Sequence, residues 1–257
     1  EALHQHASFI LPLDIQHQVL QKMHKLISEG NSTHCQNENL TKEHEIIYCE
    51  WTYTALRDSE NQVVGLATLV QNKTEFKKNQ DEIQYLAYYD TLTDLPNRRL
   101  LTDRVTHAIH SSSRNKSYCA IFFIDLDNFK NINDLHGHSA GDMLLKSVST
   151  RLKTLLREED TIARFGGDEF VILVTGLDKV EQVNIVADKL IEEFVEPMRI
   201  SEQTFYISIS IGVAYTSNSK TRALELMRQA DTAMYEAKHK GKSAYSRFTP
   251  EMTEVSH

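Results

Sequence analysis

Cysteine is scarce in this chain of 257 residues, which contains only Cys35, Cys49 and Cys119. An odd count with no Cys-x-x-Cys pair excludes a disulfide framework and is typical of a reducing cytoplasm. Long hydrophobic runs are also missing. The longest are 119–124 and 170–174, far short of the roughly 20 apolar residues that span a membrane. No basic-then-apolar leader opens the chain, so we expect a cytoplasmic location, with any membrane attachment supplied by other parts of the full-length protein.

A surplus of positive charge is missing as well. Lys and Arg number 28 against 36 Asp and Glu, which gives a formal net charge of −8. Because phosphate backbones require a basic face, we expect no nucleic-acid partner. With 40% hydrophobic and 25% charged residues, the composition is that of a globular protein of one large or two modest domains. The chain starts at Glu1 rather than Met, so we expect it to be a piece of a longer protein.

Hydrophobic periodicity divides the chain into three regions, of which the first is 1–73. Apolar residues at three-to-four-residue spacing predict a helix over 13–28. Two segments rich in β-branched and aromatic residues, 45–56 and 63–70, flank the polar turn 57–62. This pattern predicts an antiparallel hairpin.

The second region, 74–89, contains no Pro or Gly and is expected to be helical. Phe76, Ile83, Leu86 and Tyr89 can lie on one face. Either the segment forms a short two-chain coiled coil, or it is a linker helix packed on its own domain.

The third region, 90–250, interleaves helices and strands, which predicts an α/β or α+β domain built on one sheet. The expected helices are 96–112, 139–157, 178–194 and 221–240. The expected strands are 118–126, 161–165, 170–174 and 203–214.

Four clusters of polar residues in this third region can carry chemistry. Asp125 and Asp127 end a buried strand, where a carboxylate is either a ligand of a hard cation or a solvated strand terminus. Two glycines in the segment Gly166–Phe170 allow backbone amides to approach a ligand, although a plain hairpin turn has the same pattern. If strand 118–126 neighbours this hairpin, Asp125 and Asp168 can share a metal ion.

The other two clusters suit a nucleotide. Asn133 and Asp142 can read a guanine edge through an amide and a carboxylate, or belong to a turn followed by a helix capped by Ser139. Lys238 and Lys242, at the end of the last expected helix, can clamp a triphosphate or complement the helix dipole.

Taken in order, these segments resemble the GGDEF family of diguanylate cyclases. The resemblance covers nearly all of the third region and is carried by six blocks: 90–99, 123–130, 133–142, the signature Gly166-Gly167-Asp168-Glu169-Phe170, 208–214 and 230–238. It implies an α+β (α/β-like) fold with a central mixed, mainly antiparallel sheet flanked by helices. It also implies condensation of two GTP into cyclic di-GMP, with release of two pyrophosphates, across a dimer of facing domains.

The resemblance also implies a role for individual residues. Asp125, the backbone carbonyl of Leu126 and Asp168 would bind Mg²⁺, which Mn²⁺ could replace, and Asp168 would be the catalytic base. The substrate-binding set would be Phe129, Lys130, Asn133, His138, Asp142, Gly166, Gly167, Glu169, Lys238 and Lys242. Arg157 and Asp160 look like the family's RxxD inhibitory site for cyclic di-GMP, or are an ordinary charged helix end. Lys242-Ser243 departs from the family's usual Arg-Asn. Lys242 keeps the positive charge of the arginine but loses its planar fork.

The flanking segments carry looser resemblances. Residues 9–14, 51–58 and 64–75 resemble the second half of a PAS sensor domain, so we expect a partial PAS domain over 1–73, a signalling linker helix over 74–89, the GGDEF domain over 90–250 and a tail over 251–257. Residues 246–252 resemble the join to a downstream EAL domain, which this chain does not contain.

The leading hypothesis is a diguanylate cyclase that forms a homodimer through the linker helix or the PAS region, under sensor control and product inhibition. The alternative is a non-catalytic regulatory module that binds GTP or cyclic di-GMP within a larger PAS-GGDEF-EAL protein. A purely structural dimerisation domain would leave the metal and guanine residues unexplained.

Overall fold

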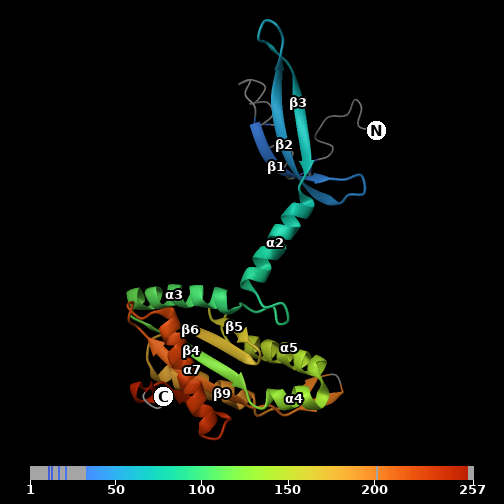
Figure 1. Ribbon diagram of the computed structural model, residues 1–257. Helices are drawn as coiled ribbons and strands as arrows, with labels where there is room; N and C mark the ends of the chain where they lie inside the picture. Colours follow the sequence, from blue (N-terminus) through green and yellow to red (C-terminus); the bar gives the residue numbers. More distant parts are fainter. Residues whose placement is uncertain are drawn as a thin grey trace. The chain divides into compact units, whose positions relative to one another are not determined.

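The computed structural model describes residues 33–200 and 202–253, together with the isolated residues Leu11, Leu13, His17 and Gln21. Apart from those isolated positions, the helix expected over 13–28 lies outside the described residues. The chain divides into two compact units, residues 1–84 and 85–257 (Figure 1).

The first unit contains a three-stranded antiparallel sheet in the order β1-β2-β3. Its strands are β1 (Thr33–Leu40), β2 (Ile46–Arg57) and β3 (Val63–Asn72). The β2–β3 pair confirms the hairpin predicted from the sequence. β1 was not predicted because its sequence THCQNENL is polar and lacks an alternating apolar face.

Helix α2 (Thr74–Tyr88) follows the sheet and coincides with the helical segment expected over 74–89. The Asn72 side chain accepts hydrogen bonds from the amide and hydroxyl of Thr74, which fixes where the helix begins. None of its residues is buried, and Phe76 and Ile83 are 66% and 68% exposed. Among the described residues, an apolar stripe on this helix is therefore left uncovered.

The second unit is built on a five-stranded sheet in the order β10-β9-β4-β6-β5. Its strands are β4 (Tyr118–Leu126), β5 (Thr161–Gly166), β6 (Glu169–Leu177), β9 (Ile209–Thr216) and β10 (Ala244–Arg247). β10 runs parallel to β9, and all other neighbours are antiparallel. The mixed, mainly antiparallel sheet that the family resemblance implied is therefore confirmed.

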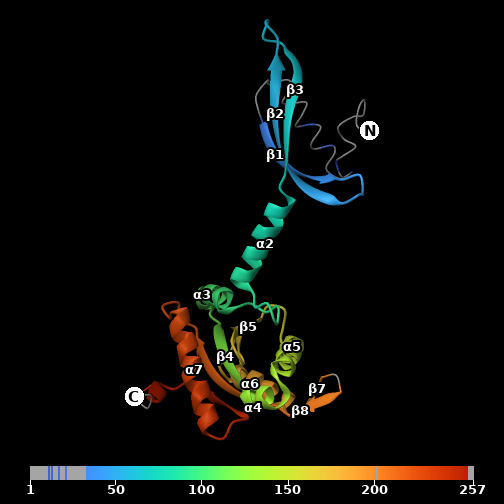
Figure 2. The same ribbon diagram turned by 45° about the vertical axis from the view of Figure 1, so that its right-hand side comes forward.

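Helices cover both faces of this sheet, as Figure 2 shows. One face carries α3 (Arg98–Asn115) and α7 (Ala223–His239). The other carries α4 (Phe129–His136), α5 (His138–Leu155) and α6 (Glu181–Glu193). Side chains of β4 alternate between them: Ile121 and Phe123 pack with α3 and α7, whereas Phe122 and Ile124 pack with α4, α5 and α6. Asp125 continues this alternation on the α7 side.

The single strand predicted over 203–214 is wrong. β8 (Gln203–Phe205) pairs with β7 (Met198–Ile200) in a separate two-stranded sheet, and the main-sheet strand starts only at Ile209. The apolar alternation misled because Phe205 and Ile207 are buried in the same core as β9 without extending its hydrogen-bonded ladder. Burial and strand pairing are thus separate properties of this segment.

The turn before α5 also differs from the prediction. Residues 129–136 form the helix α4, and α5 begins at His138, with Gly137 at the cap position, so Ser139 does not cap it. Gly137 has φ 82°, a left-handed conformation that favours glycine. The last element that the structure describes is a short 3₁₀ helix, Pro250–Thr253. Within the described ranges, every helix is too short or too polar to cross a bilayer.

Candidate active site

Two acidic segments meet where β4 and β6 lie side by side. Asp125 and Glu169 are direct partners across the antiparallel pair. The amide of Leu126 donates to the backbone carbonyl of Asp168 at 3.3 Å. The condition that strand 118–126 neighbours the glycine hairpin is therefore met, and Asp125 and Asp168 lie at the same edge.

Lys238 reaches this edge from α7. Its Nζ lies 2.7 Å from Oδ2 of Asp125, and only 10% of the Asp125 side chain is exposed. α7 can approach because Gly212 on β9 has no side chain: a methyl group there would overlap the backbone of Ala230 and Met234. The packing of α7 on the sheet thus sets the position of Lys238.

The carboxylates at this edge are short of positive charge. Burial raises the pKa of Asp125 above its ordinary value; Asp168 and Asp127 add to this, and Lys238 opposes it. Burial also raises the pKa of Glu169, helped by the negative charges of Asp231, Asp125 and Asp168. A cation beside these oxygens would relieve both effects.

The carboxylates at this edge suit a Mg²⁺ site in which the protein supplies only part of the ligands. Across the described residues, no three His, Cys, Asp or Glu side chains are gathered to hold a metal ion by themselves. Mg²⁺ is often bound by one or two carboxylates together with substrate phosphates and water. Asp125 and Asp168 fit that pattern, with the substrate completing the site.

The Gly166–Glu169 turn is open on its outer side. A methyl group added to Gly166 or Gly167 would meet no heavy atom within 4 Å, and Gly167 has φ 46°. Room of this kind lets a ligand come close to the backbone amides. Lys242 lies three residues after the end of α7, and its Nζ donates to Oδ1 of Asn128 at 2.8 Å.

The residues predicted to hold the nucleoside lie on α4 and α5. Asn133 is half-buried, and its side chain rests against Gly141, the residue before Asp142. Asp142 and His138 are exposed, as a ligand-reading pair requires. Lys130 is also exposed, whereas Phe129 is 9% exposed and packs in the hydrophobic core. The structure therefore gives Phe129 a packing role beneath this pair.

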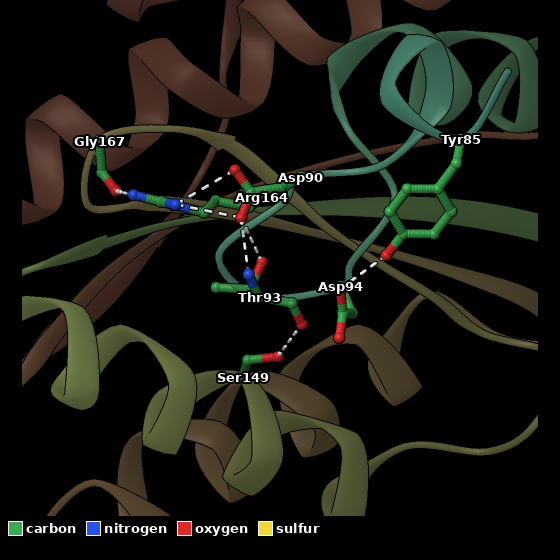
Figure 3. Close-up of polar contacts among 7 residues, drawn as sticks. All are labelled: Tyr85, Asp90, Thr93, Asp94, Ser149, Arg164 and Gly167. Carbon is green, nitrogen blue, oxygen red and sulfur yellow. Dashed lines mark hydrogen bonds and ion pairs between the residues drawn. The ribbon is translucent and has the colours of Figure 1, made fainter. Parts of the chain in front are cut away.

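Arg164 is the residue that sequence reasoning missed. Its Nη1 donates to both oxygens of Asp90, at 3.0 and 3.1 Å, and its Nε and Nη2 donate to the carbonyl of Gly167, at 3.0 and 2.7 Å (Figure 3). One guanidinium thus joins the segment after α2 to the residue before Asp168. Asp90 and Arg164 are 74 residues apart, and no local pattern signals such a pair.

The segment around Asp90 is itself well ordered by hydrogen bonds. The amide and hydroxyl of Thr93 donate to Asp90, the Tyr85 hydroxyl donates to Asp94, and the Ser149 hydroxyl donates to the carbonyl of Thr93 (Figure 3). Burial raises the pKa of Asp90, but the bonds from Thr93 and Arg164 outweigh it and hold the pKa below its usual value. The carboxylate is therefore kept ionised.

The two residues of the predicted inhibitory site lie in one turn. Arg157 is exposed and contacts Glu159 at 3.9 Å. Both oxygens of Asp160 accept backbone amides, from Arg157 at 3.2 Å and Thr175 at 3.4 Å, and burial raises its pKa. A cavity of about 460 Å³ adjoins Asp160 and is lined by Arg104, His107 and neighbours. The Arg157 guanidinium is thus available to a ligand, while Asp160 already serves the turn.

Comparison with known proteins identifies the second unit. Residues 87–244 match the family model described as "Diguanylate cyclase, GGDEF domain". The chain is 43% identical over 180 residues to the bifunctional diguanylate cyclase/cyclic di-GMP phosphodiesterase MucR of Pseudomonas aeruginosa, covering 70% of this chain and 26% of MucR. It is 36% identical over 206 residues to the diguanylate cyclase TpbB of the same species, strain UCBPP-PA14, covering 73% of this chain and 47% of TpbB.

A solved structure supports the same family assignment. The isolated GGDEF domain of PA1120 (TpbB or YfiN) from P. aeruginosa superposes with a TM-score of 0.62 at 34% identity, covering 65% of this chain and 98% of that one. The chain spans about a quarter of the length of MucR and about half of TpbB.

Proposed function

The chain belongs to the GGDEF family of diguanylate cyclase domains, and on that premise we propose that it condenses two GTP into cyclic di-GMP. The observation that carries the proposal is the ion pair of Lys238 with the buried Asp125, beside the turn that bears Asp168. It places a cation and two carboxylates at one sheet edge. Phosphoryl transfer needs such an arrangement, because its catalysis is mainly positioning and charge stabilisation.

In this reaction each 3′-oxygen forms a bond to the α-phosphorus of the other GTP. The bond between that α-phosphorus and the oxygen bridging it to the β-phosphate breaks, and pyrophosphate leaves. The proton of the 3′-hydroxyl passes to a base. Asn133 and Asp142 hold the guanine, and Lys238 and Lys242 hold the terminal phosphates. Asp168 accepts the proton, because it lies in the glycine turn whose outer side is open to a ligand.

A Mg²⁺ ion held by Asp125, Asp168 and the carbonyl of Leu126 would neutralise charge on the phosphate oxygens. Lys238 in this arrangement balances Asp125 when no nucleotide is bound, and the phosphates compete for it on binding. The ion pair with Lys238 thus lets Asp125 and Asp168 lie at one edge before a nucleotide binds.

The test is chromatography of GTP incubated with the protein and Mg²⁺. We expect cyclic di-GMP from the parent and from Asp178→Asn, a matched change in an exposed loop, and none from Asp168→Asn. Nucleotide binding without turnover in the parent would refute the cyclase and favour the alternative, a regulatory GGDEF module. The exposed Arg157 guanidinium, which lines a cavity of about 380 Å³ together with Asp160, supports that alternative, because it suits a bound product.

We further infer that catalysis requires two copies of the chain, since each domain holds one GTP. The uncovered stripe of Phe76, Ile83 and Leu86 on α2 supports pairing through this helix. Sensor control through a partial PAS unit over residues 1–73 belongs to the same proposal. Sedimentation of the parent against Ile83→Glu tests the pairing: we expect a dimer that the charged variant loses, and identical sedimentation would refute this interface.

A further inference from the structure

We propose that Asp127 is a positioning residue for GTP, whose carboxylate fixes the turn 241–243 and thereby aims the Lys242 ammonium at the triphosphate. The inference deepens the proposed function and rests on it, because Lys242 is assigned to the phosphates there. Asp127 itself touches no substrate.

The carboxylate of Asp127 is occupied by donors of this chain. Asp127 is only 4% exposed. Its Oδ1 accepts from the Ser210 hydroxyl at 2.7 Å, and its Oδ2 accepts from the Ser208 hydroxyl at 2.6 Å and the Ser243 amide at 3.1 Å. Its own amide donates to the carbonyl of Ser208 at 2.9 Å. Asp127 therefore ties the end of β4 to the start of β9 and to the residue before β10.

The turn held by Asp127 has an unfavourable backbone. Gly241, Lys242 and Ser243 have φ values of 123°, 65° and 48°. Two successive non-glycine residues in the left-handed region persist only where surrounding contacts enforce it. The Ser243 amide is held by Asp127, and the Lys242 ammonium is held by Asn128 at 2.8 Å. The adjacent residues Asp127 and Asn128 thus hold the backbone and the side chain of the same turn.

The hydrogen bonds separate this role from metal binding. Asp127 lies two residues after Asp125, so both carboxylates invite assignment as cation ligands. Asp127, however, receives three hydrogen bonds on its two oxygens, and they come from the residue before β9, from β9 itself and from the turn before β10. An asparagine could keep them, with its oxygen toward Ser208 and Ser243 and its amide toward the Ser210 hydroxyl. A carboxylate that bound the cation would lose its negative charge in that change, and the affinity for the metal would fall.

The experiment is a double-mutant cycle read by titration calorimetry. Asp127→Ala is made in the parent and in the Lys242→Met background, and each protein is titrated with GMP and with α,β-methylene GTP, which cannot release pyrophosphate. Asp127→Asn is the rescue variant, and Asp103→Ala, on the exposed side of α3, is the matched control. If Asp127→Ala does not fold, Ser208→Ala, which removes one of the three donors, takes its place.

We expect Asp127→Ala to weaken the triphosphate analogue about tenfold, the size of one charge-assisted contact, and to leave GMP within about twofold. In the Lys242→Met background the same change should cost nothing further. Asp127→Asn should restore the affinity, and Asp103→Ala should not alter it. Equal losses for both nucleotides, additive losses in the Lys242→Met background, or failure of Asp127→Asn to rescue would overturn the proposal.

A second readout separates this proposal from the proposed function. The Ser243 amide proton in ¹⁵N-labelled protein should move upfield in Asp127→Ala and stay in place in Asp127→Asn. A parent protein that binds neither nucleotide would refute the proposed cyclase activity. The Ser243 resonance would still show whether Asp127 holds the turn 241–243. A resonance that does not move in Asp127→Ala would refute that role of Asp127.

Discussion

Gly141→Ala should separate guanine recognition from folding. A methyl group at Gly141 would overlap Oδ1 of Asn133, lie 3.0 Å from Cγ of Asn133 and lie 3.1 Å from Cζ of Phe129. Favourable carbon contacts need about 3.5 Å or more. Phe129 is fixed in the core, whereas Asn133 is the end of a flexible side chain. The collision is therefore relieved by turning Asn133 away.

The magnitude follows from what Asn133 gives up. Its amide is assigned one or two hydrogen bonds to guanine, each worth about 1 kcal/mol net. We expect a loss of about 1–2 kcal/mol, or about 5–30-fold in affinity for the GTP analogue. The tight contact with Phe129 should lower the free energy of unfolding by only about 1 kcal/mol.

The assay is calorimetric titration of the variant with GTP and ATP analogues, alongside urea denaturation. Selectivity for guanine over adenine should fall, while the protein stays folded. Gly65→Ala in the three-stranded sheet is the control, because its methyl group would meet only Leu56 at 3.9 Å. Unchanged selectivity, or a loss equally large in the Asn133→Ala background, would show that Asn133 is not displaced or does not read the base.

Three further outcomes are expected. Gly212→Ala should destabilise the second unit by more than about 3 kcal/mol in urea denaturation, because its methyl group meets helix backbone rather than a movable side chain; a loss below about 1 kcal/mol would contradict this. Asp90→Asn should cost about 2 kcal/mol at neutral pH, because the Arg164 guanidinium loses its partner. The folded-state pKa of Asp90 is lowered, so this contribution is present above its ordinary pKa and is lost as pH falls through the folded value; urea curves for parent and variant should converge as the pH falls below the ordinary pKa of Asp, and a constant gap would refute the assignment. Arg157→Ala should relieve inhibition of the cyclase by added cyclic di-GMP without lowering its initial rate, and unchanged inhibition would remove Arg157 from the regulatory site.

Much of the second unit could be predicted because its signals are local. The apolar run 119–124 identified β4 to the residue, and an acidic residue at its end identified Asp125. The two glycines marked the β5–β6 turn for the same reason. The sequence signal for each of these features lies within about ten consecutive residues.

What the sequence did not reveal depends on distant partners. Arg164 meets Asp90 across 74 residues, and Asp127 meets Ser210 across 83. No spacing rule connects such residues, because the fold alone brings them together. The break between β8 and β9 was not predicted for a related reason. Phe205 and Ile207 continue the apolar alternation because both side chains are buried in the core, but β8 forms its backbone hydrogen bonds with β7 and not with the main sheet.

The central position of β4 has a consequence for motion. β4 is flanked by β6 and β9 and covered by helices on both faces, and every residue from Cys119 to Leu126 is at most 7% exposed. Its amide hydrogens should exchange with solvent only through global unfolding, and so among the slowest in the domain. Asp125 thus stands on the slowest-opening strand, whereas Lys242 stands on an exposed turn. The carboxylate edge is a fixed reference, and the exposed Lys242 side chain, on a turn whose backbone Asp127 holds, is the part that can adjust as a nucleotide arrives.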